Sequence, residues 1–166
     1  MTNALGKLLR SSLNDKRDVI TVSEDLQVTR DYLSIQQIRY GERLQVEYDF
    51  PQDILTCRIP AMTIQPLVEN AILHGAGEDE HPLHVKVSAT AEDGKLVISV
   101  SDNGAGIPGE VLEKLRDHQA GGSGVQNVTE RLKLFFGPEA EVDIQSALGS
   151  GTRIVLTCPL KKQEEA

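Results

Sequence analysis

The sequence predicts an α/β fold, more closely an α+β two-layer sandwich with helices on one face of a mostly antiparallel, mixed sheet. Segments in which apolar and polar residues alternate follow one another as hairpins, which makes neighbouring strands antiparallel. Helical patterns do not alternate strand by strand with these segments, as they would in a doubly wound parallel sheet. The 166 residues are enough to bury a single core without disulfides or a structural metal.

Two helical segments are expected at the start of the chain. The first has an apolar face formed by Leu5, Leu8 and Leu9. The second begins near Thr21, because Thr21 and Glu24 have capping-box spacing, and it ends at Gly41. Its apolar side is expected to carry Val22, Leu26, Tyr32, Leu33 and Ile35. Because the strand pattern begins only afterwards, residues 1–41 are expected to form an appendage outside the core.

The other elements follow from periodicity and from turn residues. Asp93-Gly94 and Gly149-Ser150-Gly151 are expected to be turns between paired strands. The charged tail, residues 162–166, is expected to be disordered. The expected order is strand 44–50, helix 60–75, strand 83–89, strand 96–100, helix 108–116, helix 124–136, strand 142–144 and strand 152–156.

Composition excludes several classes of protein. A net charge of −8 argues against nucleic-acid binding and against adhesion to anionic membranes. No stretch approaches the ~18 apolar residues of a membrane span, and no signal peptide is visible, so a cytosolic piece is expected. Cys57 and Cys158 are interpreted as ordinary thiols in strand-like segments. With this charge, a phosphate ligand would need Mg²⁺, backbone N–H groups or a helix N-terminus to offset the repulsion.

The helix expected over 60–75 carries the first cluster of interest. Its buried stripe is predicted to be Ile64, Leu67, Val68, Ala71 and Ile72. Glu69, Asn70 and Leu73 fall outside this stripe, and His74 lies at its edge. An Asn oxygen can ligate Mg²⁺ and a Glu can orient or deprotonate a nucleophile. A solvated polar helix face explains the same spacing.

The second cluster is Asp102-x-Gly104-x-Gly106, directly after the strongest strand pattern. The two glycines would let the backbone bend and approach a flat ligand, and Asp102 could accept a hydrogen bond from an exocyclic amine. An ordinary Asp/Asn/Gly turn has the same composition. This motif alone is therefore weak evidence for a ligand site.

The third cluster is the Gly-rich segment 121–127, which leads into a helix. Free N–H groups and the positive end of the helix dipole make such a segment an anion cradle, whereas a flexible linker is the alternative. It lacks the GxxxxGK[ST] pattern of a Walker loop. It also lacks the surrounding βαβ unit of a dinucleotide fingerprint.

In this order, the three clusters together resemble the GHKL superfamily of gyrase, heat-shock chaperone, histidine kinase and mismatch-repair ATPases. Glu69-Asn70 is similar to its N box, residues 102–107 to its G1 box and residues 122–127 to its G2 box. Gly149-Ser150-Gly151-Thr152 is similar to its late Gly-x-Gly-Thr turn. Within the superfamily the chain most resembles LytS-type sensor histidine kinases. That likeness is carried by residues 64–71, 32–44 and 127–132.

This resemblance implies a Bergerat-type ATP-binding fold over residues 42–161 and γ-phosphoryl transfer from ATP to a histidine. It implies that Asp102 accepts from the adenine amino group, that Asn70 holds Mg²⁺ and that Glu69 orients the nucleophile. Residues 117–124 would form a lid over the triphosphate. The nucleotide-binding residues implied in this way are Asn70, His74, Asp102, Gly104, Gly106, Ile107, Gly122, Ser123, Gly124, Val125 and Thr152.

The sequence departs from the family at two points. Leu73 stands where relatives usually carry a Lys, so one cation near the phosphates is missing. No phosphoacceptor His in its usual motif precedes the N box, and His81, His84 and His118 are poor substitutes. Residues 1–41 are therefore interpreted as the remnant of a dimerisation and phosphoacceptor region, and autophosphorylation of this chain alone is not expected.

The resemblance implies a two-component signal-transduction protein with two kinds of partner. These are the phosphoacceptor helix of the parent kinase, in cis or in trans, and a downstream response regulator. The domain would be cytoplasmic, and its parent would be anchored in the inner or plasma membrane. Two alternatives stay open: a catalytically weakened nucleotide-binding module, favoured by Leu73, and a stand-alone GHKL ATPase or anti-sigma-type serine kinase.

Overall fold

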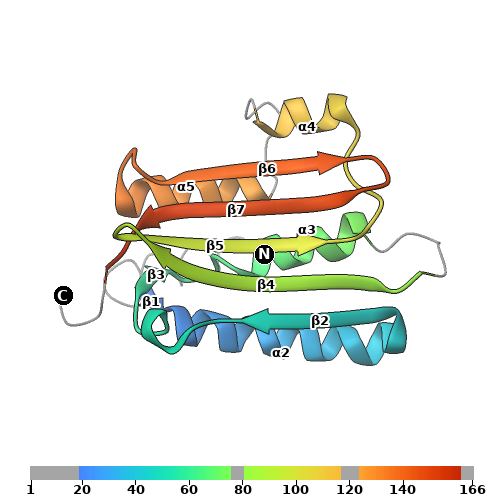
Figure 1. Ribbon diagram of the computed structural model, residues 1–166, viewed down its shortest axis with the longest axis horizontal. Coiled ribbons are helices and arrows are strands. Elements are labelled where there is room, and N and C mark those ends of the chain that lie inside the picture. Colours follow the sequence, from blue (N-terminus) through green and yellow to red (C-terminus); the bar gives the residue numbers. More distant parts are fainter. Residues whose placement is uncertain (1–18, 76–80, 117–123, 162–166) are drawn as a thin grey trace, which may run out of the picture.

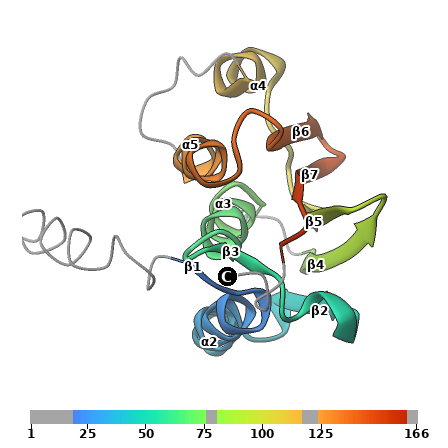
Figure 2. The same ribbon diagram turned by 90° about the vertical axis from the view of Figure 1, so that its left-hand side faces the viewer.

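The computed structural model describes residues 19–75, 81–116 and 124–161, and it has the two predicted layers. A five-stranded sheet forms one layer, and the helices α2, α3 and α5 pack on one of its faces (Figures 1 and 2). The elements are β1 (Val19–Thr21), α2 (Val22–Tyr40), β2 (Leu44–Asp49), β3 (Arg58–Pro60), α3 (Gln65–Gly75), β4 (Leu83–Glu92), β5 (Lys95–Asp102), α4 (Gly109–Arg116), α5 (Gly124–Phe136), β6 (Glu141–Ala147) and β7 (Gly151–Pro159). Single 3₁₀ turns lie at Gly41–Arg43 and Gln52–Ile54.

The sheet is mixed and mostly antiparallel, so the predicted fold class is confirmed. Its strand order is β2-β4-β5-β7-β6. Only β2 runs parallel to its neighbour β4, while the pairs β4–β5, β5–β7 and β6–β7 are antiparallel. The short strands β1 and β3 pair separately, with Val19 opposite Pro60. The predicted hairpin turn at Asp93-Gly94 joins β4 to β5.

Helix α2 begins and ends where the sequence predicted. The Thr21 hydroxyl accepts from the Glu24 N–H at 3.1 Å, and the Glu24 carboxylate accepts from the Thr21 N–H at 3.0 Å. Both halves of the capping box are therefore present. Gly41 follows the last turn with a φ of +62° and its N–H donates to the carbonyl of Gln37. Both ends of α2 are therefore set by hydrogen bonds between residues close in sequence, which explains why the sequence pattern predicted them.

Two expectations about α2 are wrong. The helix is not an appendage, because Val22 and Leu33 are fully buried in the same core as the sheet. Ile35 does not lie on the apolar side but is 64% exposed. It stands two positions after Leu33, and residues two apart on a helix do not share a face. The origin of residues 1–41 in a phosphoacceptor region remains a prediction, and residues 1–18 lie outside the described part of the chain.

Helix α3 begins five residues later than predicted, at Gln65 instead of Pro60. Pro60 is the last residue of β3, and its pairing with β1 keeps it extended. Residues 61–64 form a turn in which Met62 has a φ of +62°. The stripe predicted for α3 is confirmed, since Ile64, Leu67, Val68, Ala71 and Ile72 are all at most 6% exposed.

The core lies between the helices and the inner face of the sheet. Cys57 and Cys158 belong to it as buried thiols, in keeping with the structural role expected for them. Burial, and then the neighbouring Cys57, raise the pKa of the Cys158 thiol to about 12. Among the helices in the described ranges, none has both the length and the apolar content needed to cross a bilayer.

Candidate functional site

Asp102 ends β5 on the helix-facing side of the sheet. Side chains alternate along a strand, so Asp102 shares a face with Val100 and Ile98, both buried in the core. Thr152 lies directly opposite Asp102 on β7 and is 6% exposed. The Asp102 carboxylate accepts a hydrogen bond from the Gly104 N–H at 2.8 Å. A partly buried carboxylate and a hydroxyl therefore meet at the carboxyl end of β5.

The loop after β5 is fastened to the β6–β7 turn. The Gly149 N–H donates to the carbonyl of Ala105 at 2.8 Å. The Ile107 N–H donates to the hydroxyl of Ser146 at 2.8 Å, and that hydroxyl also lies 2.8 Å from the hydroxyl of Thr152. The predicted site residues Ile107 and Thr152 are thus joined through Ser146, a residue that sequence reasoning did not single out.

Gly106 and Gly151 allow the loop after β5 and the β6–β7 hairpin to pack closely against each other. Gly151 has a φ of +80°, and a Cβ placed there would overlap the carbonyl oxygen of Asp102. Gly106 has a φ of +81°, and a Cβ there would overlap the carbonyl oxygen of Ala147. Side chains are excluded at both positions by backbone conformation and by space. We call Asp102, residues 103–107 and Thr152 the sheet wall.

Helix α3 packs against β5 and carries the next two predicted site residues. Glu69 is exposed and Asn70 is half-buried, so both lie outside the buried stripe as predicted. Gln65, one turn earlier, donates from its amide to the Glu69 carboxylate at 2.9 Å. Burial raises the pKa of Tyr32 on α2, and the negative charge of Glu69 raises it further.

Asn70 follows Pro66, the residue of α3 that lies against the start of α5. A Cβ at Gly124, the first residue of α5, would lie 3.5 Å from the Cβ of Pro66. Asn70 is one helical turn after Pro66 on the same face. Figure 2 shows α3 between α2 and α5, and Figure 1 shows the carboxyl end of β5 and the end of α3 at the same end of the sheet. We call Glu69, Asn70 and Gly124 the helix wall.

The other predicted site residues fall into two groups. Val125 is 4% exposed, so it anchors the first turn of α5 in the core. Gly122 and Ser123, together with His118 and the rest of the predicted lid over 117–123, lie outside the described residues. The side chain of His74 also lies outside them, although its backbone belongs to the last turn of α3.

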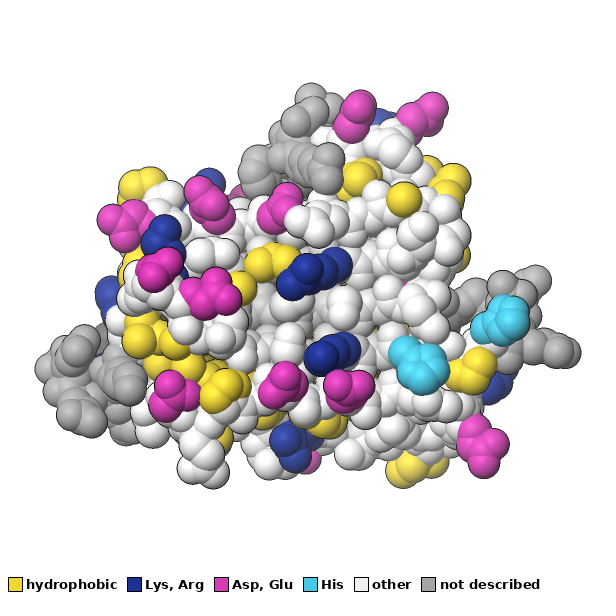
Figure 3. Space-filling model, viewed as in Figure 1, with side chains coloured by type: hydrophobic (Ala, Val, Ile, Leu, Met, Phe, Trp, Pro, Cys, Tyr) yellow, Lys and Arg dark blue, Asp and Glu magenta, His cyan; other side chains and the backbone are white. Residues whose placement is uncertain are grey.

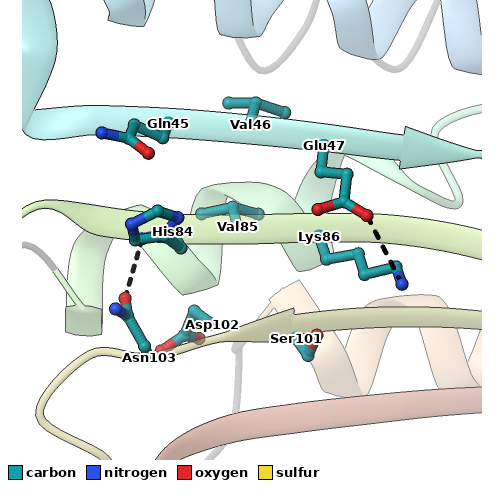
Figure 4. Close-up of a pocket in the computed structure, with 9 residues that line it drawn as sticks. All are labelled: Gln45, Val46, Glu47, His84, Val85, Lys86, Ser101, Asp102 and Asn103. Carbon is teal, nitrogen blue, oxygen red and sulfur yellow. Dashed lines mark hydrogen bonds and ion pairs between the residues drawn. The ribbon is translucent and has the colours of Figure 1, made fainter.

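A different hollow lies on the helix-free face of the sheet. It has a volume of about 450 Å³ and is lined by Gln45, Val46, Glu47, His84, Val85, Lys86, Ser101, Asp102 and Asn103 (Figure 4). Its outward side chains include the Lys86–Glu47 ion pair at 3.5 Å. Figure 3 shows basic and acidic side chains close together on this face. The hollow is open and carries side chains of both charges. It lies on the opposite face of the sheet from the side on which Asp102 and Thr152 are neighbours.

The donor set limits which metal the site could hold. Among the described residues, no three His, Cys, Asp or Glu side chains gather into a metal-binding group. Mg²⁺ is commonly bound through substrate phosphates, water and one or two protein oxygens rather than by an all-protein cage. The single amide oxygen of Asn70, which is half-buried on α3, fits a metal that arrives with a phosphate ligand.

The start of α3 depends on a residue that sequence reasoning missed. Asp25 of α2 is 1% exposed, and its carboxylate accepts the N–H groups of Met62, Thr63 and Ile64. Its position in the stripe formed by Val22, Leu26, Thr29 and Leu33 was the available signal, since a charged residue in a buried stripe requires partners.

Comparison with known proteins yields matches over almost the whole chain. The profile of the histidine kinase-, DNA gyrase B- and HSP90-like ATPases matches residues 59–162, and a histidine kinase profile matches residues 1–44. The sensor histidine kinase YesM of Bacillus subtilis is 37% identical over 98% of this chain and 28% of its own length. The sensor protein LytS of Staphylococcus saprophyticus is 36% identical over 97% of this chain. This chain spans about 28% of the length of either relative.

Solved structures share the fold. The catalytic domain of the histidine kinase ThkA superposes with a TM-score of 0.65 at 15% identity, covering 86% of this chain and 95% of that domain. Full-length ShkA in complex with AMPPNP superposes with a TM-score of 0.64 at 18% identity, covering 96% of this chain and 36% of ShkA. The resemblance expected from the sequence is confirmed by the profiles and by these relatives.

Proposed function

Because the chain belongs to the family of histidine kinase-, DNA gyrase B- and HSP90-like ATPases, we propose that it transfers the γ-phosphoryl group of ATP to a histidine on another helix. The chain is an ATP-binding catalytic domain of the sensor histidine kinase type. What we propose beyond this is the phosphoryl acceptor, the role of each site residue and the partners of the domain in its parent protein. The observation that carries it is the placement of Asp102 and Thr152 on the helix-facing side of the sheet, at the same end as the end of α3.

The sheet wall binds the base. Asp102 accepts from the adenine amino group, while its bond to the Gly104 N–H fixes the direction of the carboxylate. Gly104, Gly106 and Ile107 shape the loop beneath the base. Thr152 is held by Ser146 and offers its hydroxyl beside Asp102. A charge-assisted hydrogen bond in a partly buried site gives both affinity and selectivity for an amino purine.

The helix wall acts on the phosphates. Asn70 supplies an amide oxygen to Mg²⁺, which when bound neutralises phosphate charge and so eases attack by a nucleophile. The N–H groups of Gly122, Ser123 and Gly124, with the positive end of the α5 dipole, bind phosphate oxygens. His74 and Val125 complete the set of nucleotide-binding residues. These groups offset the net charge of −8 at the point where a polyanion must approach.

Glu69 orients the acceptor. It is exposed, so an incoming imidazole can reach it, and Gln65 restrains one carboxylate oxygen. A carboxylate in this position accepts a proton from one imidazole nitrogen while the other nitrogen attacks phosphorus. Phosphoryl transfer of this kind depends mainly on positioning and charge neutralisation.

Titration calorimetry with ADP and Mg²⁺ tests the nucleotide site. Asp102→Asn should weaken ADP binding roughly 10- to 100-fold, the value of one hydrogen bond to a charged group. Asp93→Asn, at the turn of the same hairpin, is the matched control and should bind like wild type. Equal ADP affinity in Asp102→Asn and wild type would refute the site.

A phosphotransfer assay tests the acceptor and Glu69. A separately supplied histidine-bearing helix should become labelled from γ-labelled ATP in the presence of the domain. Glu69→Gln should lower kcat roughly 10²- to 10⁴-fold with unchanged ADP affinity, as expected for loss of a general base. Labelling of serine, or ATP hydrolysis without a histidine partner, would instead assign a different acceptor.

One alternative function has a specific observation in its favour. Leu73 is 76% exposed on α3, so the usual cation is replaced by a side chain with no packing role. The alternative is a nucleotide-binding module with weakened catalysis. Trans-phosphorylation by wild type and Leu73→Lys, measured side by side, separates the two. Activity that appears only with Lys supports the weakened module, and activity in wild type supports the kinase.

The setting in the whole protein follows from its relatives. Because YesM and LytS are sensor kinases, we propose that this domain acts beside a phosphoacceptor helix of its parent, in cis or in trans, and that a response regulator receives the phosphoryl group. We also propose that the domain is cytoplasmic and that its parent is anchored in the inner or plasma membrane. No nucleic-acid partner is proposed.

A further inference from the structure

The N-terminus of α3 is capped by a different helix. The Asp25 carboxylate on α2 accepts the N–H groups of Met62 at 2.9 Å, Thr63 at 3.2 Å and Ile64 at 2.9 Å. These N–H groups precede the first residue of α3 and have no partner within the helix. A local Ser, Thr, Asp or Asn usually supplies such a cap. Here the cap comes from a buried carboxylate on an element packed against α3.

Arg131 of α5 holds the same segment from its other side. Its guanidinium donates to the carbonyl of Ala61 and, at 3.2 Å, to the carbonyl of Met62. The amides of the segment therefore bind a carboxyl group on α2, while its carbonyls bind a guanidinium on α5. Met62 is kept at a φ of +62°, which is uncommon for a residue with a side chain. We call Asp25, Arg131 and residues 61–64 the clamp.

The clamp determines how the three helices are placed. It fixes the start of α3 with respect to α2, and Asn70 lies on the rigid helix that begins directly after Ile64. It also ties α3 to α5, whose first residue, Gly124, lies about two turns before Arg131. The separation between the Asn70 amide and the N–H groups at the start of α5 therefore depends on the clamp. Asp102 belongs to the sheet and does not depend on it in this way.

We propose that Asp25 and Arg131 are positioning residues for the magnesium-dependent part of nucleotide binding. This rests on the proposed function, because it takes Asn70 as the magnesium ligand. Neither side chain needs to touch the nucleotide. They act through the 61–64 segment by holding Asn70 and the start of α5 at the separation that a metal–phosphate group requires. Binding of the base is independent of them.

The test measures ADP affinity by calorimetry with and without Mg²⁺. In Asp25→Asn, the gain in affinity on adding Mg²⁺ should fall about tenfold, a coupling of the size found between contacting residues. Affinity without Mg²⁺ should stay at the wild-type value because Asp102 is undisturbed. Hydrogen exchange at the Met62, Thr63 and Ile64 amides should become faster, which reports the loosened clamp without any nucleotide.

Two further variants make the result decisive. Arg131→Lys keeps the charge but loses the planar fork, so it should show the same selective loss even if Asp25→Asn folds poorly. Thr29→Val is the matched control, because it removes a buried hydrogen bond from the same helix, to the Asp25 carbonyl, and leaves the carboxylate in place. Thr29→Val should lower stability and keep the wild-type response to Mg²⁺.

Three outcomes separate the hypotheses. A wild-type response to Mg²⁺ in both Asp25→Asn and Arg131→Lys overturns the clamp proposal. So does a loss in Thr29→Val as large as that in Asp25→Asn, because general destabilisation then explains the effect. Absence of ADP binding by wild type overturns the proposed function itself, which distinguishes that failure from a failure of the clamp.

Discussion

The two walls of the site are built in different ways. The sheet wall is held by backbone: Gly149 bonds to Ala105, and Gly151 packs on the carbonyl of Asp102. The helix wall is held by side chains that reach from other helices, with Asp25 and Arg131 gripping the segment before α3. Neighbouring backbone leaves no room for a Cβ at Gly106 or Gly151, whereas the helix side depends on hydrogen bonds from two charged side chains.

In the proposed nucleotide site, the two proposed roles, base binding and phosphate binding, fall on elements that are held in these two different ways. A wall made of backbone has few ways to rearrange, which suits recognition of a flat base by fixed atoms. A wall held by side-chain hydrogen bonds between helices can change its spacing when one helix moves. Nucleotide identity and metal geometry should therefore respond to different mutations, and the predictions below test that separation.

The largest effect is expected at Gly151. Gly151→Ala should lower the free energy of unfolding by about 4 kcal/mol, because the new Cβ adds backbone strain at a φ of +80° and overlaps Asp102. Urea denaturation measures this. Gly149→Ala is the matched control: its φ is +81° but no atom lies within 4 Å of the new Cβ, so about 1 kcal/mol is expected. Equal losses in the two variants would contradict a sheet wall closed by contact.

A smaller effect is expected at Arg131. Arg131→Met should cost about 2 kcal/mol in urea denaturation, since the carbonyls of Ala61 and Met62 lose a charged donor. Arg153→Met is the control on the exposed face of the sheet, where the side chain donates to Ser99 at 3.2 Å. It should change stability by about 0.5 kcal/mol or less. A neutral Arg131→Met would show that the helix wall does not need the clamp.

The sheet away from the site should show a distinct pH dependence. The Cys158 pKa is about 12 when folded against 9.0 for the free thiol, so above pH 9 the unfolded chain loses a proton that the folded chain keeps. The stabilising contribution of the Cys158 thiol is fully present below pH 9. Above pH 9 the free energy of unfolding should fall by roughly 1.4 kcal/mol per pH unit. Urea titrations from pH 8 to 10.5 should show this slope in wild type. A Cys158→Ala variant with an identical slope would contradict the assignment.

The smallest effect is expected at Thr21, the residue that caps the N-terminus of α2. Thr21→Ala removes one half of the capping box of α2 and should cost about 1 kcal/mol in thermal or urea unfolding. The response of ADP binding to Mg²⁺ should stay as in wild type, because the clamp is one turn further along the helix. Ser23→Ala, an exposed neighbour, is the control and should stay within about 0.5 kcal/mol of wild type.

The same contrast explains what the sequence could predict. The strands, the capping box at Thr21 and the stripe of α3 follow from neighbours within a few positions, and all are present. Asp102 was predicted as a site residue because it comes at the end of a strand pattern and precedes two glycines, and its role stays a prediction. Local periodicity and turn chemistry were enough to predict the fold class.

The helix wall was only partly predictable. The start of α3 was misplaced at Pro60 because the bonds that set it come from Asp25 and Arg131, far away in sequence. The contact of Gly106 with Ala147 was also missed, since nothing near Gly106 indicates which backbone lies against it. Side-chain bonds between distant segments leave only an indirect trace, such as a charged residue within a buried stripe.

The two long connections within the sheet have a consequence for how the molecule folds. Residues 50–82, which contain α3, separate β2 from β4, and residues 103–150, which contain α4 and α5, separate β5 from β7. Closing such long loops is entropically costly, so both pairings should form after the β4–β5 and β6–β7 hairpins. Asn70 lies within the first loop and Gly124 within the second, so the proposed phosphate-binding elements should come together late in folding.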